Sequence, residues 1–306
     1  MPAPARILVI RGGAMGDFIL TLPVLGALRR RFPAARLELL ANAPFAPLAI
    51  ATSLADDYRK LDAAEWASAF TLDTTLPPVL HDWLSTFDLI LSYLHDPNHI
   101  FKANICQATP ARWIQCPTPA LTAQHAADQL LVPLAPLDIR IPAKLPELTI
   151  PNPDPSTSTL ALHPGSGSPT KNWPETHWTN LLDQLITETD LPLLLIGGEA
   201  EQDTLPRLAA RLPAYRHRVL FHPPLPDLAR ALVGCAAFLG HDSGPTHLAA
   251  ALRLPTVALW GQTPPEVWKP LGPAVHLLRP SGGLNTLTPA QVLRALTPLL
   301  PHPTHP

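Results

Sequence analysis

Small polar residues surround a Gly-Pro step in the stretch GHDSGPTHLAA, residues 240–250. Apolar runs precede and follow it, so we expect it to join a buried strand to a helix. Asp242 and Ser243 stand where a helix N-cap is expected, and Gly244 precedes a proline that the first turn of a helix tolerates. The stretch is therefore either helix-capping chemistry or the floor of a site where exposed helix amides bind a sugar diphosphate.

Two histidines in the same stretch raise the question of a metal ion. His241 and His247 have ring nitrogens that suit zinc, but no third ligand follows at a convincing spacing. We predict no metal site here. The role of His241 stays open.

A second loop, HPGSGSPTKNWPE, spans residues 163–175. It offers several backbone N–H groups, two serines and Lys171 ahead of a predicted helix. Aligned amides and the positive end of a helix dipole favour an anion, and Lys171 would add a mobile point charge. The loop is therefore a candidate phosphate cradle, although a solvated turn with a surface lysine has the same composition.

Two carboxylates also follow glycines at the ends of predicted strands. Asp17 follows RGGAMG, which has neither the order of a dinucleotide fingerprint nor the GK[ST] of a P-loop. It is either a functional carboxylate at the mouth of the expected cleft or a first-turn carboxylate worth about 1 kcal/mol to its helix. Glu199 follows LLLIGG, where a carboxylate can bind ribose hydroxyls or simply complement a helix dipole.

Strands that alternate with helices would position these loops. Apolar runs predict strands at residues 6–10, 37–40, 89–93, 112–116, 160–162, 193–196, 219–221, 238–240 and 256–260, and helices near 18–28, 45–51 and 174–187. The pattern predicts an α/β fold with two doubly wound halves, whose ligands bind beyond the carboxyl ends of the strands and in a cleft between the halves. A proline-rich stretch, residues 132–158, is expected to link domains 1–150 and 151–306 and to hold at most one edge strand.

Composition narrows the class of function. The chain has 306 residues, of which 46% are hydrophobic, enough for a core in each domain. A formal net charge of -2 gives no general attraction to nucleic acid. No apolar run approaches the ~18 residues of a membrane span, and the start lacks a signal-peptide pattern. Three cysteines far apart in the sequence indicate neither a zinc site nor disulfides, and they fit a reducing cytoplasm.

A basic run, Arg29 to Arg31, closes the first predicted helix. Cations at that end complement the helix dipole, which is one interpretation of the run. Contact with an anionic acceptor or with a membrane surface is the other.

Four blocks of the chain, taken in order, resemble glycosyltransferase family 9, the ADP-heptose:lipopolysaccharide heptosyltransferases. The blocks are ILVIRGGAMGDFILTLPVLGALRRRFP, LALHPGSGSPTKNWPETHW, LLLIGGEAEQD and FLGHDSGPTHLAAALRLPTVALWGQTPPEVW. The resemblance implies a GT-B architecture, in which two Rossmann-like domains face each other across a cleft. It also implies metal-independent transfer of a heptose from ADP-heptose with inversion of the anomeric centre.

The resemblance assigns roles to individual residues. Asp17 matches the general base, and Gly12, Gly13 and Arg29 would lie on the acceptor side. On the donor side, Ser166 and Lys171 would contact the diphosphate, Glu199 the ribose, and Asp242, Ser243, Gly244 and His247 the sugar and diphosphate.

The expected partners are a nucleotide-sugar donor and a lipid-linked or oligosaccharide acceptor, with peripheral contact at the cytoplasmic face of the inner membrane and no cofactor. The loop of Gly12, Gly13 and Ala14 lacks the serine pair usual in the family, which leaves another acceptor or donor sugar open. The alternatives are a GT-B transferase or epimerase that uses another nucleotide sugar, and a nucleotide-sugar binding protein without activity.

Overall fold

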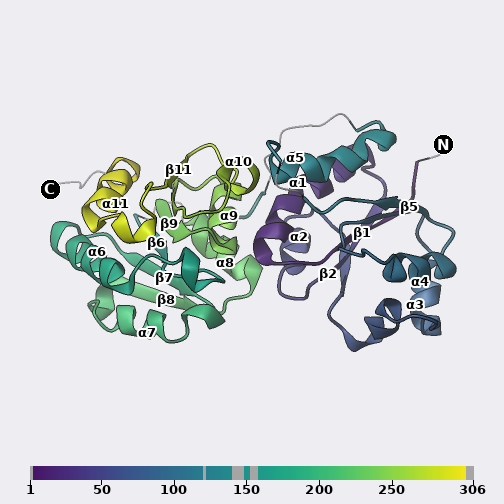
Figure 1. Ribbon diagram of the computed structural model, residues 1–306, viewed down its shortest axis with the longest axis horizontal. Coiled ribbons are helices and arrows are strands. Elements are labelled where there is room, and N and C mark those ends of the chain that lie inside the picture. Colours follow the sequence, from purple (N-terminus) through teal and green to yellow (C-terminus); the bar gives the residue numbers. More distant parts are fainter. Residues whose placement is uncertain (1–2, 120–121, 140–147, 152–157, 301–306) are drawn as a thin grey trace. The chain divides into compact units, whose positions relative to one another are not determined.

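The computed structural model describes residues 3–119, 122–139, 148–151 and 158–300. The chain divides into two compact units, Met1–Pro146 and Glu147–Pro306, where the sequence placed the boundary after residue 150. Each unit is built on its own parallel sheet with helices packed against it (Figure 1). This is the α/β, doubly wound architecture that the alternation of strands and helices predicts.

Unit 1 has a five-stranded parallel sheet in the order β3-β2-β1-β4-β5. Its strands are β1 Arg6–Arg11, β2 Arg36–Ala41, β3 Asp57–Lys60, β4 Leu89–Ser92 and β5 Arg112–Gln115. Its helices are α1 Met15–Arg31, α2 Pro47–Ala51, α3 Pro78–Leu84, α4 Ile100–Ala108 and α5 Ala126–Leu131, with the 3-10 turns η1 Ala64–Phe70 and η2 Val132–Leu137. β1 lies in the middle of the sheet, between β2 and β4, and its sequence is apolar because both of its faces are buried.

Unit 2 has a six-stranded parallel sheet in the order β11-β10-β9-β6-β7-β8. Its strands are β6 Leu160–His163, β7 Leu193–Gly197, β8 His217–Phe221, β9 Ala237–His241, β10 Thr256–Leu259 and β11 Val275–Leu278. Its helices are α6 Glu175–Glu188, α7 Thr204–Ala209, α8 Leu225–Val233, α9 Gly244–Ala251, α10 Pro265–Trp268 and α11 Pro289–Leu296. Its 3-10 turns are η3 Pro169–Lys171, η4 Glu199–Glu201, η5 Ala214–Arg216, η6 Leu284–Thr286 and η7 Thr297–Leu299.

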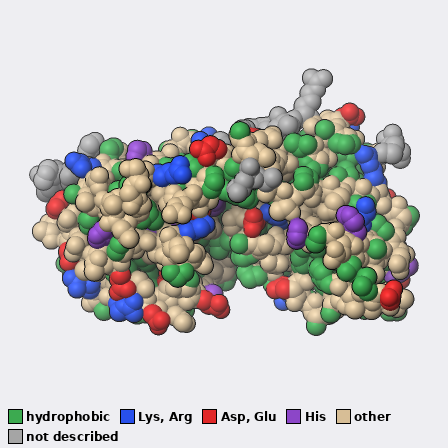
Figure 2. All heavy atoms as spheres, viewed as in Figure 1, with side chains coloured by type: hydrophobic (Ala, Val, Ile, Leu, Met, Phe, Trp, Pro, Cys, Tyr) green, Lys and Arg blue, Asp and Glu red, His purple; other side chains and the backbone are tan. Residues whose placement is uncertain are grey.

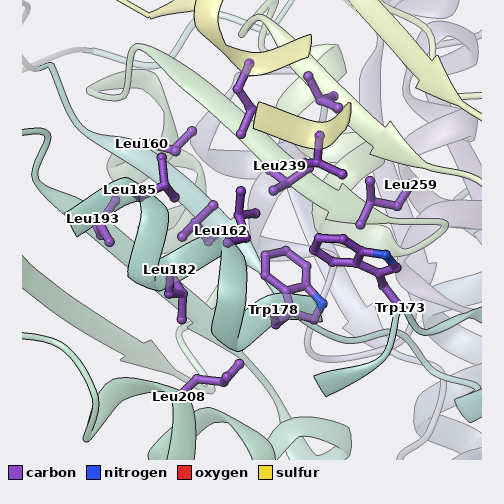
Figure 3. Close-up of a cluster of buried hydrophobic side chains, with 14 of the residues drawn as sticks. Leu160, Leu162, Trp173, Trp178, Leu182, Leu185, Leu193, Leu208, Leu239 and Leu259 are labelled. Carbon is purple, nitrogen blue, oxygen red and sulfur yellow. The ribbon is translucent and has the colours of Figure 1, made fainter. Parts of the chain in front are cut away.

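One core of unit 2 fills the space between the sheet and α6. Leucines of the strands and of α6 interdigitate there, and two indole rings close one end of the cluster (Figure 3). Trp173 and Trp178 pack edge to face with ring centroids 5.4 Å apart. Trp173 belongs to the loop after β6 and Trp178 to α6, which follows that loop, so this core anchors one of the predicted functional loops.

The predicted linker, residues 132–158, is only partly described. Val132–Leu137 forms η2 and packs in unit 1, with Leu134 and Leu137 buried. Residues 140–147 and 152–157 of the predicted linker lie outside the described residues. The rest of the stretch that the structure does describe contains no strand.

On the face shown in Figure 2, Lys and Arg side chains are dispersed among apolar and acidic ones, without a broad basic area. Within the described ranges, none of the helices is both long enough and apolar enough to cross a membrane.

Candidate active site

The sheet of unit 2 changes its direction of growth between β6 and β9. From β6 the chain moves outward to β7 and β8, then returns to β9 and continues to β10 and β11. The loops that leave the neighbouring strands β6 and β9 therefore diverge, and doubly wound sheets bind ligands at such a point. The loop after β6 carries Ser166 and Lys171, and the loop after β9 begins at Asp242.

An ion pair joins these two loops. Lys171 Nζ lies 2.6 Å from Asp242 Oδ2, and the Thr263 hydroxyl donates to the same oxygen at 2.6 Å. The side chain of Asp242 is 9% exposed, whereas that of Lys171 is 40% exposed. The lysine ammonium can therefore turn toward an incoming anion while Thr263 continues to hold the carboxylate. Thr263 could not be singled out from the sequence, because a single threonine in a loop is ordinary.

Ser166 is buried inside its own loop, with 3% of its surface exposed. Its hydroxyl lies 2.8 Å from the Ser168 carbonyl and 2.7 Å from Asn172 Oδ1, and it accepts a bond from the Ser168 N–H. A hydroxyl has one proton and can donate to only one of these acceptors at a time. Ser166 thus shapes the loop, and a direct contact with phosphate stays a prediction.

Ser243, rather than Asp242, is the N-cap residue of α9. Its backbone is extended, with φ of -153° and ψ of 163°, and its hydroxyl makes no capping bond. The prediction that an aspartate caps this helix is wrong, because Lys171 and Thr263 bind the Asp242 carboxylate instead. In the first turn of α9, the N–H groups of Gly244 and Thr246 have no acceptor within the helix. Pro245 has no N–H, and the His247 N–H donates to the Ser243 carbonyl.

The histidines of this stretch differ in role. His241 accepts a bond at Nε2 from the Trp173 N–H at 2.8 Å, so its proton is on Nδ1, which faces the Gly165 carbonyl at 3.1 Å. Burial lowers the pKa of His241 to about 3, so the ring is neutral. His241 therefore anchors the loop after β6 to β9. His247 lies in the first turn of α9 with its ring buried, and its contact with a donor stays a prediction.

Two carboxylates follow β7, and they have opposite environments. The side chain of Glu199 is 91% exposed, and its carboxylate lies 3.9 Å from His222 Nε2. Glu201 is 4% exposed and accepts the Gly198 N–H at 2.8 Å. Glu199 is thus accessible to solvent, and its contact with a ribose stays a prediction, while Glu201 belongs to the interior.

Glu201 faces His163, a residue that the sequence analysis did not single out. His163 is the last residue of β6 and is 4% exposed. Its Nε2 lies 3.7 Å from Glu201 Oε2, and its Nδ1 lies 3.2 Å from Ser243 Oγ. The only signal in the sequence was position, because His163 directly follows a predicted strand and its partners are far away along the chain.

Unit 1 has a similar switch point between β1 and β4, and Asp17 lies beside it in the first turn of α1. Asp17 Oδ2 accepts the Ala14 N–H at 3.0 Å, and Oδ1 lies 3.3 Å from Arg11 Nη2. Arg11 ends β1, is buried, and also donates to the carbonyls of Asp17 and Tyr93. Since the Asp17 side chain is 34% exposed, a carboxylate held on two sides still reaches solvent.

The glycine loop before Asp17 has a conformational reason for one of its glycines. Gly13 has φ of +95°, and a Cβ there would lie 2.8 Å from Asp17 Oδ2. The side chain of Asn42 donates to the Gly13 carbonyl at 2.8 Å and so holds the loop. Contact of Gly12 or Gly13 with an acceptor stays a prediction.

Arg29 is not brought together with the other predicted residues. It follows Asp17 by twelve residues in α1, about 18 Å along the helix at 1.5 Å per residue. Its guanidinium donates to Asp56 at 2.8 Å and to the Ala35 carbonyl at 3.0 Å. Although burial opposes it, hydrogen bonds from Arg29 and from the Leu37 N–H hold the pKa of Asp56 below its ordinary value. Arg29 thus has a structural partner at the far end of the helix.

Comparison with known proteins shows which family this chain is similar to. The model of glycosyltransferase family 9 (heptosyltransferase) matches residues 133–283. The chain is 26% identical over 287 residues to lipopolysaccharide heptosyltransferase 1 of Pseudomonas aeruginosa, a match that covers 85% of this chain and 79% of that protein.

Solved structures share the fold. Escherichia coli ADP-heptose lps heptosyltransferase II superposes with a TM-score of 0.78 and 21% identity, covering 96% of this chain and 98% of that one. The Escherichia coli heptosyltransferase WaaC with ADP gives a TM-score of 0.78 and 21% identity, covering 96% and 99%. The architecture of two parallel sheets is therefore that of GT-B enzymes. The chain is a glycosyltransferase, and the family that it resembles in sequence and in fold is glycosyltransferase family 9, the heptosyltransferase family.

Proposed function

We propose that this enzyme moves a heptose from ADP-heptose to an acceptor of the lipopolysaccharide-core type, with inversion of the anomeric carbon and without a metal ion. The observation that carries the proposal is the ion pair of Lys171 and Asp242 at the switch point of unit 2. The relative named for heptosyl transfer to lipopolysaccharide, similar over 85% of this chain, supports the choice of sugar and acceptor. The structure named for its bound ADP supports the choice of nucleotide.

Unit 2 would bind the donor. Lys171, with a partly exposed ammonium, would neutralise part of the diphosphate charge, and the free amides at the start of α9 would bind its oxygens. Asp242, Ser243, Gly244 and His247 would line the sugar and diphosphate. Glu199 would accept from the ribose hydroxyls, since its carboxylate is exposed beyond β7.

Unit 1 would bind the acceptor and supply the base. Asp17 would remove the proton of the acceptor hydroxyl. A lone pair of that oxygen would then attack the anomeric carbon from the face opposite ADP. The bond from that carbon to the β-phosphate oxygen breaks, and its electrons leave with ADP. One glycosidic bond forms as one breaks, which inverts the anomeric centre.

We propose metal independence because of the side chains that are available to bind a metal ion or the diphosphate. In the described part of the chain, no group of three or more His, Cys, Asp and Glu side chains is arranged to hold a metal ion. Lys171 and the α9 amides would supply the positive charge that the diphosphate needs. Turnover that persists in EDTA would support this, and activity restored by a divalent cation after EDTA would contradict it.

We also propose that the enzyme works in the cytoplasm, with peripheral contact at the inner membrane. The reason is the class of acceptor, because a lipid-linked core presents its sugars at a membrane surface. Binding to vesicles that contain the acceptor lipid, compared with vesicles that lack it, tests this placement.

The substitution Asp17→Asn tests the assignment of the base. Asparagine keeps the size of the side chain but cannot take up a proton, so heptose transfer should fall by at least about 100-fold. ADP affinity, measured by titration calorimetry, should not change. Asp82→Asn, at an exposed carboxylate of α3, is the matched control and should leave both quantities unchanged. Normal turnover in Asp17→Asn would show that the base is another group.

A further inference from the structure

The hydroxyl of Ser243 lies among protein groups that can take its proton. His163 Nδ1 is 3.2 Å away, the His241 carbonyl is 3.4 Å away, and Thr246 Oγ1 is 3.2 Å away. The Thr246 hydroxyl itself donates to the His241 carbonyl, so its proton is already used. What Ser243 offers to a ligand therefore depends on which atom of His163 carries the proton.

Glu201 decides the position of that proton. Its buried carboxylate faces His163 Nε2 at 3.7 Å and accepts the Gly198 N–H. Although burial opposes it, His163 and the Gly198 N–H hold the pKa of Glu201 below its ordinary value, so the carboxylate is charged. A buried negative charge on one side of an imidazole places the ring proton on that side. With its one proton on Nε2, a neutral His163 ring would present a bare Nδ1 to Ser243.

Packing around Glu201 holds its carboxylate in this position and leaves His163 as the imidazole that faces it. A Cβ at Gly165 would lie 2.0 Å from Glu201 Oε1, so only glycine at that position admits the carboxylate. The neighbouring ring of His241 is neutral, and both of its nitrogens are bonded to the backbone of the loop after β6. His241 can therefore neither neutralise Glu201 nor donate to Ser243 from its ring.

We propose that Glu201 and His163 are positioning residues that make Ser243 a hydrogen-bond acceptor, so that Ser243 recognises a hydroxyl of the transferred sugar rather than a phosphate oxygen. The Ser243 hydroxyl donates its hydrogen bond to a group of the protein. The lone pairs of Oγ are then left to accept a hydrogen bond from a ligand. Phosphate oxygens cannot donate, whereas a sugar hydroxyl can. This inference rests on the proposed function, which places the donor sugar beside Ser243 and Asp242.

Binding of ADP and of ADP-heptose, each without acceptor, separates the two kinds of contact. Titration calorimetry on the full chain should show that Ser243→Ala and His163→Gln each weaken ADP-heptose about three- to tenfold, the usual effect of one hydrogen bond. ADP affinity should not change in either variant. The double variant should bind ADP-heptose no more weakly than Ser243→Ala alone, because His163 acts through Ser243.

Several results would overturn the inference. Equal losses for ADP and ADP-heptose would mean that Ser243 serves the nucleotide or its phosphates, and additive losses in the double variant would mean that His163 acts only through the fold. Glu201→Gln, which removes the charge and keeps an acceptor for Gly198, provides a second cycle if His163→Gln does not fold. In that cycle too, the loss should be confined to ADP-heptose and should be non-additive with Ser243→Ala.

A histidine elsewhere in unit 2 provides the control. His217 begins β8, at the opposite end of the strands, and its Nδ1 contacts the Pro213 carbonyl. His217→Gln should leave binding of both ligands unchanged. If the wild-type chain binds neither ADP nor ADP-heptose, the proposed function fails and the inference fails with it. Additive losses in a chain that binds both ligands would instead remove the inference alone.

Discussion

Two buried histidines show how environment, rather than residue type, sets the chemistry of this site. His163 and His241 end the paired strands β6 and β9, and both are almost inaccessible to solvent. Backbone groups bind both nitrogens of His241 and burial keeps its ring neutral, whereas His163 faces the Glu201 carboxylate and Ser243. The sequence left the role of His241 open and did not single out His163. Neither ring could be assigned without its partners, which are 38 or more residues away in the chain.

The neutral state of His241 predicts how stability varies with pH. Burial lowers its pKa in the folded chain to about 3 from an ordinary value of 6.5. Between these two values the unfolded chain binds a proton that the folded chain does not, so lowering the pH favours unfolding. As the pH falls through this window, the contribution of His241 to the free energy of unfolding should decrease by up to about 1.4 kcal/mol per pH unit. This contribution should have its full value only above pH 6.5.

His241→Gln provides the measurement. Glutamine can still accept the Trp173 N–H but does not titrate, so this part of the pH slope should disappear. Urea unfolding of both proteins, followed between about pH 4 and pH 7, compares the slopes. Parallel slopes for the two proteins would contradict a neutral, buried His241.

At the scale of elements, the central strands could be predicted and two edge strands could not. The run of β1 is apolar because both faces of the strand are buried, which is a signal that the sequence carries by itself. β3 reads DYRK and β11 is only partly buried, because an edge strand needs little apolar surface. The loops at the strand ends were located correctly, but which polar side chain each loop turns inward, Glu199 or Glu201, depends on packing against Gly165.

The conformation of the turn between β1 and α1 predicts that a substitution at Gly13 lowers stability and activity. Its φ of +95° is a region that side chains rarely adopt, and an added methyl group would press on the Asp17 carboxylate. Gly13→Ala should lower the free energy of unfolding by roughly 1–3 kcal/mol and reduce transfer as Asp17 is displaced. Chemical denaturation and a transfer assay measure the two effects.

Gly26→Ala, in the helix that follows this turn, is the matched control. Gly26 lies in α1, where alanine is the better helix former, and an added methyl group would meet only flexible side chains. This variant should be neutral or slightly more stable. Equal behaviour of the two variants would mean that the conformation of Gly13 is not required.

At the scale of the whole molecule, two doubly wound units of similar design carry different chemistry at their switch points. Unit 1 has a carboxylate held by a buried arginine, and unit 2 has an ammonium paired with a carboxylate beside free helix amides. The alternation of strands and helices was sufficient to predict this architecture. The separation of Arg29 from Asp17 was not predictable from the motif alone, because a basic residue in the same helix can lie at either end of it.

The identity of the released nucleotide tests the central claim most directly. The wild-type chain is incubated with a lipopolysaccharide-core acceptor and, in parallel, with ADP-heptose or with UDP-linked sugars, and the nucleotide and the glycosylated acceptor are quantified. We predict release of ADP in equal amount to heptosylated acceptor and no turnover of the UDP-linked donors. Turnover of a UDP-linked sugar but not of ADP-heptose, or binding of ADP without any turnover, would contradict the proposed function.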